Sequence, residues 1–358
     1  MLKKMLLMLL FVSAGFALGL LTPFIQNSLV GEDGELLVPT IITPTLPKKE
    51  LPLQKYSLTK LADLPRSTAP IQIVKELEAT SSYTSYLFTW TTQGKIMTGQ
   101  VNLPRPFDPE NATTIVLLRG YVPEDSYETG VGTKNAAAIF AQQGYMTVAP
   151  DFFGYGGSDP EPTDTWQARF EKPLLVMELL DSLKIAGIQG DGTPPILSKN
   201  IGIWAHSNGG QIALSTLEAF QLTIPTTLWA PVSAPFPYSI QFFSDEIEDE
   251  GKSQRKWISL FEDDYDVFDY SVTQHLDMLK APLQLHHGET DDAAPIAWSD
   301  EFVEKLEAAQ VATAAATQTP YPITYYRYKG TDHNMQPKTS WNTAIQRDLT
   351  FFAKTLAE

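Results

Sequence analysis

The amino-acid sequence predicts an α/β protein with a mostly parallel central sheet flanked by helices. From about residue 71 onward, short apolar and β-branched runs alternate with amphipathic stretches. Several of these runs are apolar throughout, which is typical of strands covered on both faces. One of them, NIGIWA at 200–205, passes through a short turn into the helix-forming stretch QIALSTLEAF. This strand–turn–helix order is that of a parallel sheet with helical crossovers.

The expected elements follow in chain order. TSYLFTW and GKIMTGQVNLP predict an opening β-hairpin, and TTIVLLRG at 113–120 predicts the next strand. A short helix over 133–143 ends at Gly144 and is followed by the strand YMTVAP. A long helix comes next, with apolar residues at three- and four-residue spacing and with Pro173 either kinking or starting it. The remaining expected elements are NIGIWA, QIALSTLEAF, TTLWA, PLQLHH, ITYYRY and a C-terminal helix marked by Trp341, Ile345, Leu349, Phe352 and Leu356.

The N-terminus has a different character. Lys3 and Lys4 precede an apolar run from Met5 to Ile25, and its 21 residues would span about 31 Å as a helix, close to the thickness of a bilayer core. Two interpretations fit residues 1–30, an uncleaved membrane anchor and a cleaved signal peptide. The length of the run favours the anchor. In both interpretations the lysines stay inside and the rest of the chain is exported.

Residues 31–75 are expected to form an extended spacer, because prolines recur there without apolar periodicity. Residues 76–358 are then expected to form a single folded domain. A membrane would be contacted only through the N-terminal segment, and only if that segment is not cleaved. The sequence gives no indication of the oligomeric state.

Composition excludes several classes of protein. The 358 residues include no cysteine, which removes disulfide scaffolds, thiolate zinc sites and thiol nucleophiles. The formal charge of −16, from 42 acids against 26 bases, argues against a nucleic-acid partner. The acidic string EDDYD lacks the spacing of an EF-hand loop, so no metal is expected. No other cofactor is expected either.

The string AHSNGG at 205–210 is the most informative in the chain. A serine on a sharp strand-to-helix turn needs small residues two positions before and two after, because the strand and the helix approach closely there. Ala205 and Gly209 meet that need, which makes Ser207 the candidate nucleophile. The backbone N–H of Asn208 is a candidate oxyanion donor, favoured by the helix dipole. His206 is interpreted as a wall or packing residue.

A serine nucleophile needs a base, and five histidines are available. His333 is the candidate, because it lies in a loop between the last strand and the last helix, at the carboxyl ends of the strands. His286 and His287 end an apolar strand and are interpreted as packing residues. His275 lies in an amphipathic stretch and is interpreted as structural, and His206 adjoins the nucleophile.

The base in turn needs an acid to orient it. The loop after PLQLHH reads GETDDAAP, and both Asp291 and Asp292 qualify, with Asp291 preferred. The resulting order along the chain is Ser207, Asp291, His333, which differs from the orders of chymotrypsin and subtilisin. A second oxyanion donor is expected from the backbone N–H of Tyr121, in the loop after the strand at 113–120.

On these residues the chain resembles the α/β-hydrolase superfamily from about Tyr83 to the C-terminus. It is most similar to the catalytic domain of prolyl oligopeptidases and to the dienelactone-hydrolase-like esterases. Five segments carry the resemblance in the expected order: VLLRGY, APDFFGYGGSD, IGIWAHSNGG, APLQLHHGETDDAAP and KGTDH. The resemblance implies an α/β-hydrolase fold with a short lid insert, and it places the acid on Asp291.

The chain departs from the family pattern at a few positions. Ala205 replaces the first glycine of the elbow, and Gln284 and Ala294 replace apolar residues of the acid segment. Arg119 stands where a histidine is usual, and two interpretations are equally weighted: a substrate-binding cation, or a salt-bridged surface arginine.

An insert at 236–270 is the expected lid. Between Asp245 and Asp269 it carries ten acids against three bases. It is interpreted either as a mobile acidic lid or as a solvated amphipathic helical hairpin.

The function that follows is that of a serine hydrolase working through an acyl-enzyme on small esters or short peptides. Two alternatives stay open. A non-catalytic surface binding protein on the same scaffold is disfavoured by the complete triad, and another chemistry such as dehalogenation is disfavoured by a serine nucleophile.

Overall fold

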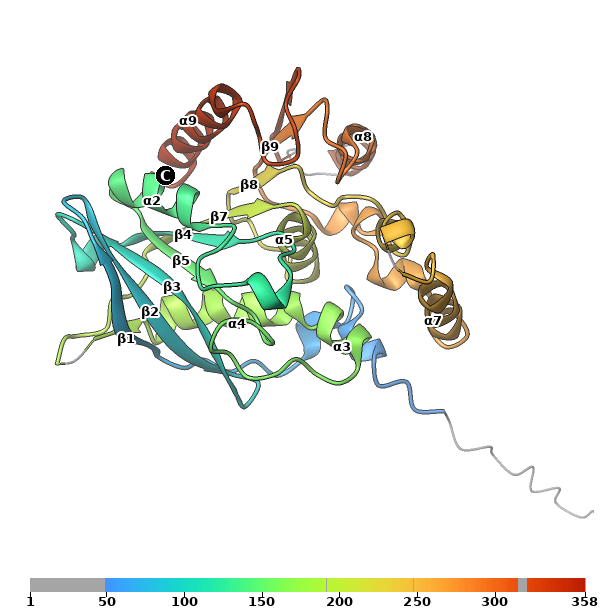
Figure 1. Cartoon of the computed structure of the whole chain (residues 1–358), viewed down its shortest axis with the longest axis horizontal. Helices are drawn as coiled ribbons and strands as arrows, with labels where there is room; N and C mark the ends of the chain where they lie inside the picture. Colours follow the sequence, from blue (N-terminus) through green and yellow to red (C-terminus); the bar gives the residue numbers. More distant parts are fainter. Residues whose placement is uncertain (1–48, 191, 247, 315–320, 358) are drawn as a thin grey trace, which may run out of the picture. The chain divides into compact units, whose positions relative to one another are not determined.

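A ten-stranded sheet forms the centre of the molecule in the computed structural model (Figure 1). The chain divides into a unit before residue 51 and the unit Leu51–Glu358, and the second is described here. The anchor or signal segment and residues 31–48 of the expected spacer lie outside the described residues. Among the residues described, no helix is both long and apolar enough to cross a membrane. The residues that the structure describes are 49–190, 192–246, 248–314 and 321–357.

The sheet confirms the predicted fold class. Its strand order is β10-β9-β8-β7-β4-β5-β3-β2-β1-β6, and all pairs from β10 to β5 are parallel. The predicted hairpin is present, since β2 and β3 pair antiparallel from Tyr83↔Pro104 to Thr92↔Lys95. The strands are β1 (Ile71–Ala79), β2 (Tyr83–Thr92), β3 (Lys95–Pro104), β4 (Thr113–Leu118), β5 (Met146–Pro150), β6 (Ile188–Gln189), β7 (Asn200–His206), β8 (Thr226–Trp229), β9 (Leu283–Gly288) and β10 (Ile323–Tyr328).

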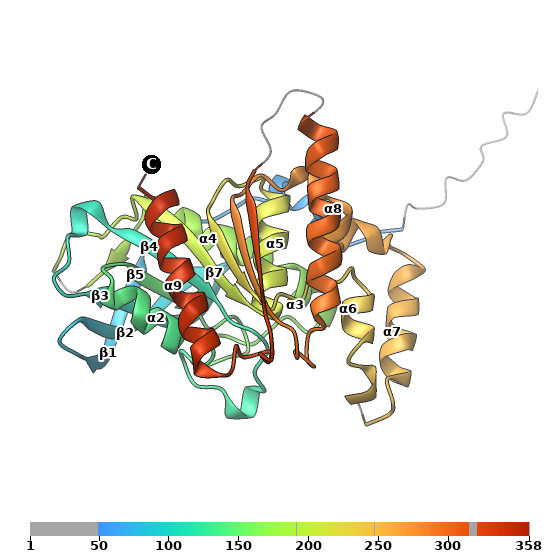
Figure 2. The ribbon, with the colours of Figure 1, turned by 90° about the horizontal axis from the view of Figure 1, so that it is seen from above.

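Helices cover both faces of the sheet, because its central strands are apolar on both sides. In β4, Ile115 and Leu117 belong to one buried cluster, and Val116 and Leu118 belong to the other, as the two-residue period of a strand requires. The helices α2 (Lys134–Gln142) and α9 (Lys338–Thr355) cover the first face. The opposite face carries α4 (Lys172–Ile185), α5 (Asn208–Ala219) and α8 (Ile296–Ala314) (Figures 1 and 2).

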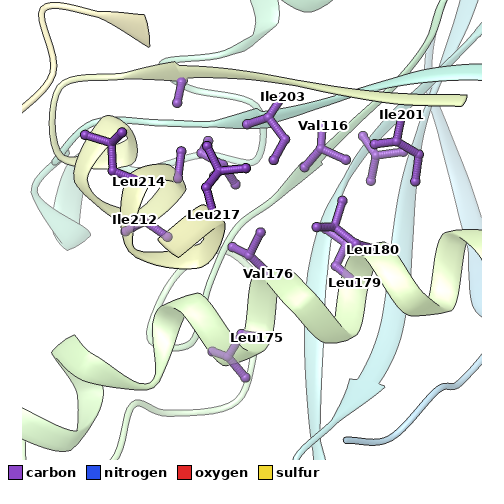
Figure 3. Close-up of a cluster of buried hydrophobic side chains, with 14 of the residues drawn as sticks. Val116, Leu175, Val176, Leu179, Leu180, Ile201, Ile203, Ile212, Leu214 and Leu217 are labelled. Atoms are coloured by element: carbon purple, nitrogen blue, oxygen red, sulfur yellow. The ribbon is translucent and has the colours of Figure 1, made fainter. Parts of the chain in front are cut away.

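The second face has the larger core. Leucines and valines of α4 lie against residues of α5 and against the isoleucines of β7 (Figure 3). Ile203, Leu214, Leu217 and Leu179 are fully buried there. This packing fixes α5 on the sheet, and with it the turn that precedes α5.

The long helix expected around Pro173 is two helices. The shorter one, α3 (Thr165–Phe170), is capped by Asp164, whose side chain accepts hydrogen bonds from the N–H groups of Trp166 and Gln167. A new helix, α4, starts after Glu171, with Pro173 in its first turn. Proline is tolerated in a first turn because the N–H it lacks would have no partner inside the helix.

The insert at 236–270 is helical, with α6 (Tyr238–Gln241), α7 (Lys252–Glu262) and short 3-10 helices. Its apolar residues are packed only in part, since Phe242, Leu260 and Phe268 are exposed. Ile258 and Phe261 are buried, and the ring of Trp257 stacks on Trp166 of α3 at a centroid distance of 4.3 Å. The insert is therefore attached to α3 through aromatic contacts.

Part of the expected spacer is packed against this insert. Two 3-10 helices, Gln54–Tyr56 and Leu61–Asp63, precede the sheet. The N–H of Leu58 donates to the carbonyl of Asp269 at 2.9 Å, and the Tyr270 hydroxyl donates to the carbonyl of Leu53 at 3.0 Å. The composition of this stretch did not reveal the packing, because the residues that contact it are more than 100 positions away. The buried residues are Leu53, Tyr56, Leu58 and Leu61.

We expect Leu61→Ala to lower the free energy of unfolding by about 2 to 4 kcal/mol, because it leaves a cavity under a fully buried side chain. Urea denaturation of the full chain measures this. Leu77→Ala, at a position that is 43% exposed, serves as the control and should change stability by less than about 0.5 kcal/mol. Equal and small effects of both substitutions would show that residues 51–63 do not contribute to the folded unit.

Candidate active site

Ser207 lies on the turn between β7 and α5 in a strained backbone conformation, with φ 56° and ψ −122°. The turn lies in close contact with β4, and this contact explains why position 209, two residues after Ser207, is a glycine. A Cβ on Gly209 would lie 2.1 Å from the carbonyl oxygen of Leu118, which no side chain tolerates. The expected strand–turn–helix arrangement is therefore present, and it projects Ser207 from the carboxyl end of the sheet.

The structure brings Ser207, His333 and Asp291 together. The Oγ of Ser207 is 2.9 Å from Nε2 of His333, and Nδ1 of His333 is 2.8 Å from Oδ2 of Asp291. Asp291 comes from the loop after β9, and His333 from the loop between β10 and α9. The serine hydroxyl can donate to the imidazole while the imidazole donates to the carboxylate. This is a relay in which the serine proton has an acceptor and the resulting imidazolium has a counter-charge.

Asp291, and not Asp292, is the acid of this relay. Its Oδ1 accepts hydrogen bonds from the N–H groups of Ala293 and Ala294 at 2.9 and 2.8 Å, whereas Asp292 is exposed. Burial alone raises the pKa of Asp291. Hydrogen bonds from His287, His333 and the Ala294 N–H outweigh burial and hold that pKa well below its usual range. The carboxylate is thus ionised at neutral pH.

His287 and His206 contact the relay, which the packing interpretation of the sequence missed. The Nε2 of His287 lies 3.1 Å from Oδ2 of Asp291 and 2.8 Å from the carbonyl oxygen of Ala294, so it carries a proton and donates. His206 donates from Nε2 to the carbonyl oxygen of His333 at 2.9 Å. Both side chains hold the loops that carry the acid and the base. The signal that could have identified them is their position in the sequence, since His206 adjoins Ser207 and His287 lies four residues before Asp291.

His206 is neutral at physiological pH. Burial and the neighbouring His333 lower the pKa of His206 to about 4, although the hydrogen bond to the His333 carbonyl acts in the opposite direction. A neutral ring beside the base adds no positive charge that would oppose protonation of His333.

The two remaining histidines lie apart from the relay. His286 is fully buried and contacts Asp348 through Nε2 and Tyr328 through Nδ1, at 2.9 and 2.7 Å. His275 bonds the carbonyl of Phe268. Both have the structural role that the sequence indicated.

The two expected oxyanion donors belong to residues that lie close to Ser207. Asn208 is the first residue of α5, so its N–H has no acceptor within the helix. Gly120 lies against Ser207, since a Cβ on Gly120 would be 2.9 Å from the Ser207 Cβ. The peptide joining Gly120 to Tyr121 is therefore next to the nucleophile. The Tyr121 side chain itself is exposed.

Arg119 fits neither interpretation that the sequence suggested, a substrate-binding cation or a salt-bridged surface arginine. It is buried, with 6% exposure, and its guanidinium lies between the rings of Tyr127 and Tyr155, 4.5 and 4.0 Å from their centroids. It donates to the carbonyl oxygens of Gly120 and Asp151, both at 3.0 Å. It is thus not a surface residue, and its charge is directed at backbone and aromatic rings instead of at a substrate.

The hydrogen bond from Arg119 to the Gly120 carbonyl orients the peptide that carries the Tyr121 N–H. The Gly120 carbonyl and the Tyr121 N–H belong to one peptide unit, and in a trans peptide the two bonds point in opposite directions. Fixing the carbonyl on the guanidinium therefore directs the Tyr121 N–H away from Arg119. A cation on the carbonyl also polarises the peptide and strengthens its N–H as a donor.

No group of three or more His, Asp or Glu side chains within the described ranges is arranged to hold a metal ion. The groups gathered around Ser207 can supply a nucleophile, a base with its orienting acid, and backbone N–H donors for a developing negative charge.

Comparisons with known proteins show the family of this chain. The sequence profile of the prolyl oligopeptidase family matches residues 132–358, and the chain belongs to this family. A comparison with curated proteins finds no matching sequence.

Solved structures show the same α/β-hydrolase fold. A puromycin-hydrolysing peptidase from Mycobacterium tuberculosis is 16% identical with a TM-score of 0.58; the match covers 78% of this chain and 40% of that one. Dipeptidyl peptidase 4 from Porphyromonas gingivalis is 17% identical with a TM-score of 0.55, and 76% and 36% are covered. An esterase from Pyrococcus furiosus is 15% identical with a TM-score of 0.52, and the match covers 81% of this chain and the whole of the esterase.

We expect Asp291→Asn to slow covalent labelling of Ser207 by a fluorophosphonate by about 10⁴-fold, because an amide cannot stabilise the imidazolium. The neighbouring Asp292→Asn, which removes the same charge from an exposed position, should label at the rate of the unmodified chain. Second-order labelling rates measured by intact-protein mass spectrometry distinguish the two. Equal slowing of both variants would contradict the assignment of the acid.

We expect Arg119→Met to slow the same labelling reaction by about 10- to 100-fold, somewhat less than the loss of an oxyanion donor. The reason is that the peptide carrying the Tyr121 N–H loses its fixed orientation. Arg119→Lys keeps the charge and should recover part of the rate. A folded Arg119→Met protein, judged by its thermal transition, that labels at the normal rate would contradict the orienting role.

Proposed function

We propose that the protein is a serine hydrolase that cleaves small esters or short amide and peptide bonds through an acyl-enzyme. The observation that carries the proposal is the continuous chain of contacts from Ser207 Oγ to His333 Nε2, and from His333 Nδ1 to Asp291, at 2.9 and 2.8 Å. Membership of the prolyl oligopeptidase family supports it.

The reaction begins when Ser207 Oγ attacks the substrate carbonyl and His333 accepts the hydroxyl proton. Asp291 holds the imidazole by its Nδ1–H and balances the positive charge. The tetrahedral oxyanion is held by the N–H groups of Asn208 and Tyr121. Collapse of this intermediate expels the leaving group, which takes the proton from His333. Water then attacks the acyl-enzyme with His333 as base, and the acid product leaves.

The proposal covers both esters and amides because one set of groups serves both. The mycobacterial neighbour is named as a puromycin-hydrolysing peptidase and the Pyrococcus neighbour as an esterase. Both share the fold with this chain, but their sequence identity to it is too low to indicate the substrate.

We further propose that the chain is exported and attached to a membrane through the N-terminal segment, on the basis of Lys3, Lys4 and the apolar run that follows them.

We expect Ser207→Ala to lower turnover of a 4-nitrophenyl ester by about 10⁶-fold and to abolish labelling by a fluorophosphonate, because the nucleophile is removed. The exposed Ser126→Ala serves as the matched control and should retain full activity. Circular dichroism and thermal unfolding test whether each variant is folded. If the unmodified chain is folded but neither labels nor hydrolyses any ester or amide, the protein is a non-catalytic binder on this scaffold.

A further inference from the structure

A small cavity lies next to the nucleophile turn, on the side of the sheet that carries α4 and α5. It has a volume of about 120 Å³ and is lined by residues of α3, by the first turns of α4 and α5, and by the packed N-terminal segment. Asn208, the residue that follows the nucleophile, is part of its wall, as is Gln211 one turn further along α5. The charged residues of its wall are Arg169, Lys172 and Glu161.

The cavity contains a positive charge that lacks a partner of opposite sign. Lys172 is paired with Glu161 at 3.1 Å, so these two charges offset each other. Arg169 forms no ion pair within the described ranges, and its one hydrogen bond there runs from Nη2 to the neutral Oε1 of Gln211 at 2.6 Å. A guanidinium has five N–H donors, so most of those on Arg169 remain available to a ligand.

Arg169 is cationic in the folded protein. Burial lowers the pKa of Arg169 to about 10, with no contribution from a neighbouring charge, and the group is therefore protonated at neutral pH. Arg169 is half-buried. A cation that is partly removed from water and has no counter-charge is costly, and an anion entering the cavity would reduce that cost. The N-terminus of α5 opens at the same cavity and also favours negative charge there.

We propose that this cavity binds a carboxylate carried by the substrate, with Arg169 as its partner, so that the enzyme prefers substrates with a short anionic group close to the scissile carbonyl. The inference rests on the proposed function, because it places the carboxylate on a molecule held at Ser207. The volume sets the length of that group. A cavity of 120 Å³ is well below the roughly 300 Å³ at which drug-sized pockets begin, so it admits a chain of a few atoms and not a large residue.

The carboxylate can be part of the acyl group or of the leaving group, and paired substrates separate the two sources. On the acyl side, 4-nitrophenyl hydrogen glutarate is compared with 4-nitrophenyl methyl glutarate, in which the same carboxylate is masked as a methyl ester. On the leaving-group side, the butyrate ester of glycolic acid is compared with the butyrate ester of methyl glycolate. Each comparison is made at one ionic strength, because the net charge of −16 repels every anion to an extent that depends on salt.

We expect kcat/KM of the unmodified full chain to favour the anionic member of one pair by about 10- to 100-fold, the factor that a charge-assisted hydrogen bond provides. In Arg169→Gln the preference should vanish, so that the ratio of kcat/KM between the anionic and the neutral member of the pair falls to about one. Arg169→Lys should retain part of the preference. Arg105→Gln removes an arginine from an exposed position and should leave the preference intact.

Binding provides a readout that does not depend on turnover. Monomethyl glutarate should bind to the Ser207→Ala chain more tightly than dimethyl glutarate by calorimetry, and the difference should be lost when Arg169→Gln is added. If the chain hydrolyses neutral esters but favours neither anionic substrate, and monomethyl glutarate binds no better than the diester, the inference is overturned while the proposed function stands. If no ester is hydrolysed but the binding difference depends on Arg169, the carboxylate site stands and the proposed function fails.

Discussion

The close approach of the Ser207 turn to the end of β4 is the constraint on which the site depends. Gly209 lies directly against Leu118, and Gly120 lies directly against Ser207. Side chains larger than hydrogen at either glycine would separate the nucleophile from the loop that carries the Tyr121 N–H. The strained conformation of Ser207 is maintained by this packing, because α5 is held on the sheet by a large buried core. The nucleophile and the oxyanion loop are therefore positioned by one contact.

Three histidines that are far apart in the sequence have different tasks once the loops fold. In the proposed mechanism His333 is the base, while His206 bonds the backbone carbonyl of His333 and His287 bonds Asp291. A sequence pattern identifies the base by its loop at the end of the last strand. It cannot identify the residues that hold that loop, because their partners are determined by how strands β7 and β9 meet it. The neutral state of His206 also depends on burial, which only the fold supplies.

The fold class, most strands and helices, and the assembly of Ser207, Asp291 and His333 were predictable because each rests on a local pattern. Short runs that are apolar and β-branched predicted the strands, and the nucleophile turn has strict size requirements at Ala205 and Gly209. Other features depend on distant partners and were not predictable. Examples are the burial of residues 53–61 against the insert and the division of the long helix into α3 and α4.

Arg119, which is buried, and Arg169, which is half-buried, show why the partner of a charge decides its role. Arg119 was the cation that the sequence placed near the substrate, yet two backbone carbonyls and two tyrosine rings surround its guanidinium. Its field acts on the peptide beside Ser207. Arg169 drew no attention in the sequence because it lies in an ordinary amphipathic helix, yet its only partner among the described residues is a neutral amide in the wall of a cavity. The Nη atoms of Arg119 donate to backbone carbonyls, so this cation orients the protein. Arg169 keeps donors available in a cavity, and in our proposal it selects what enters that cavity.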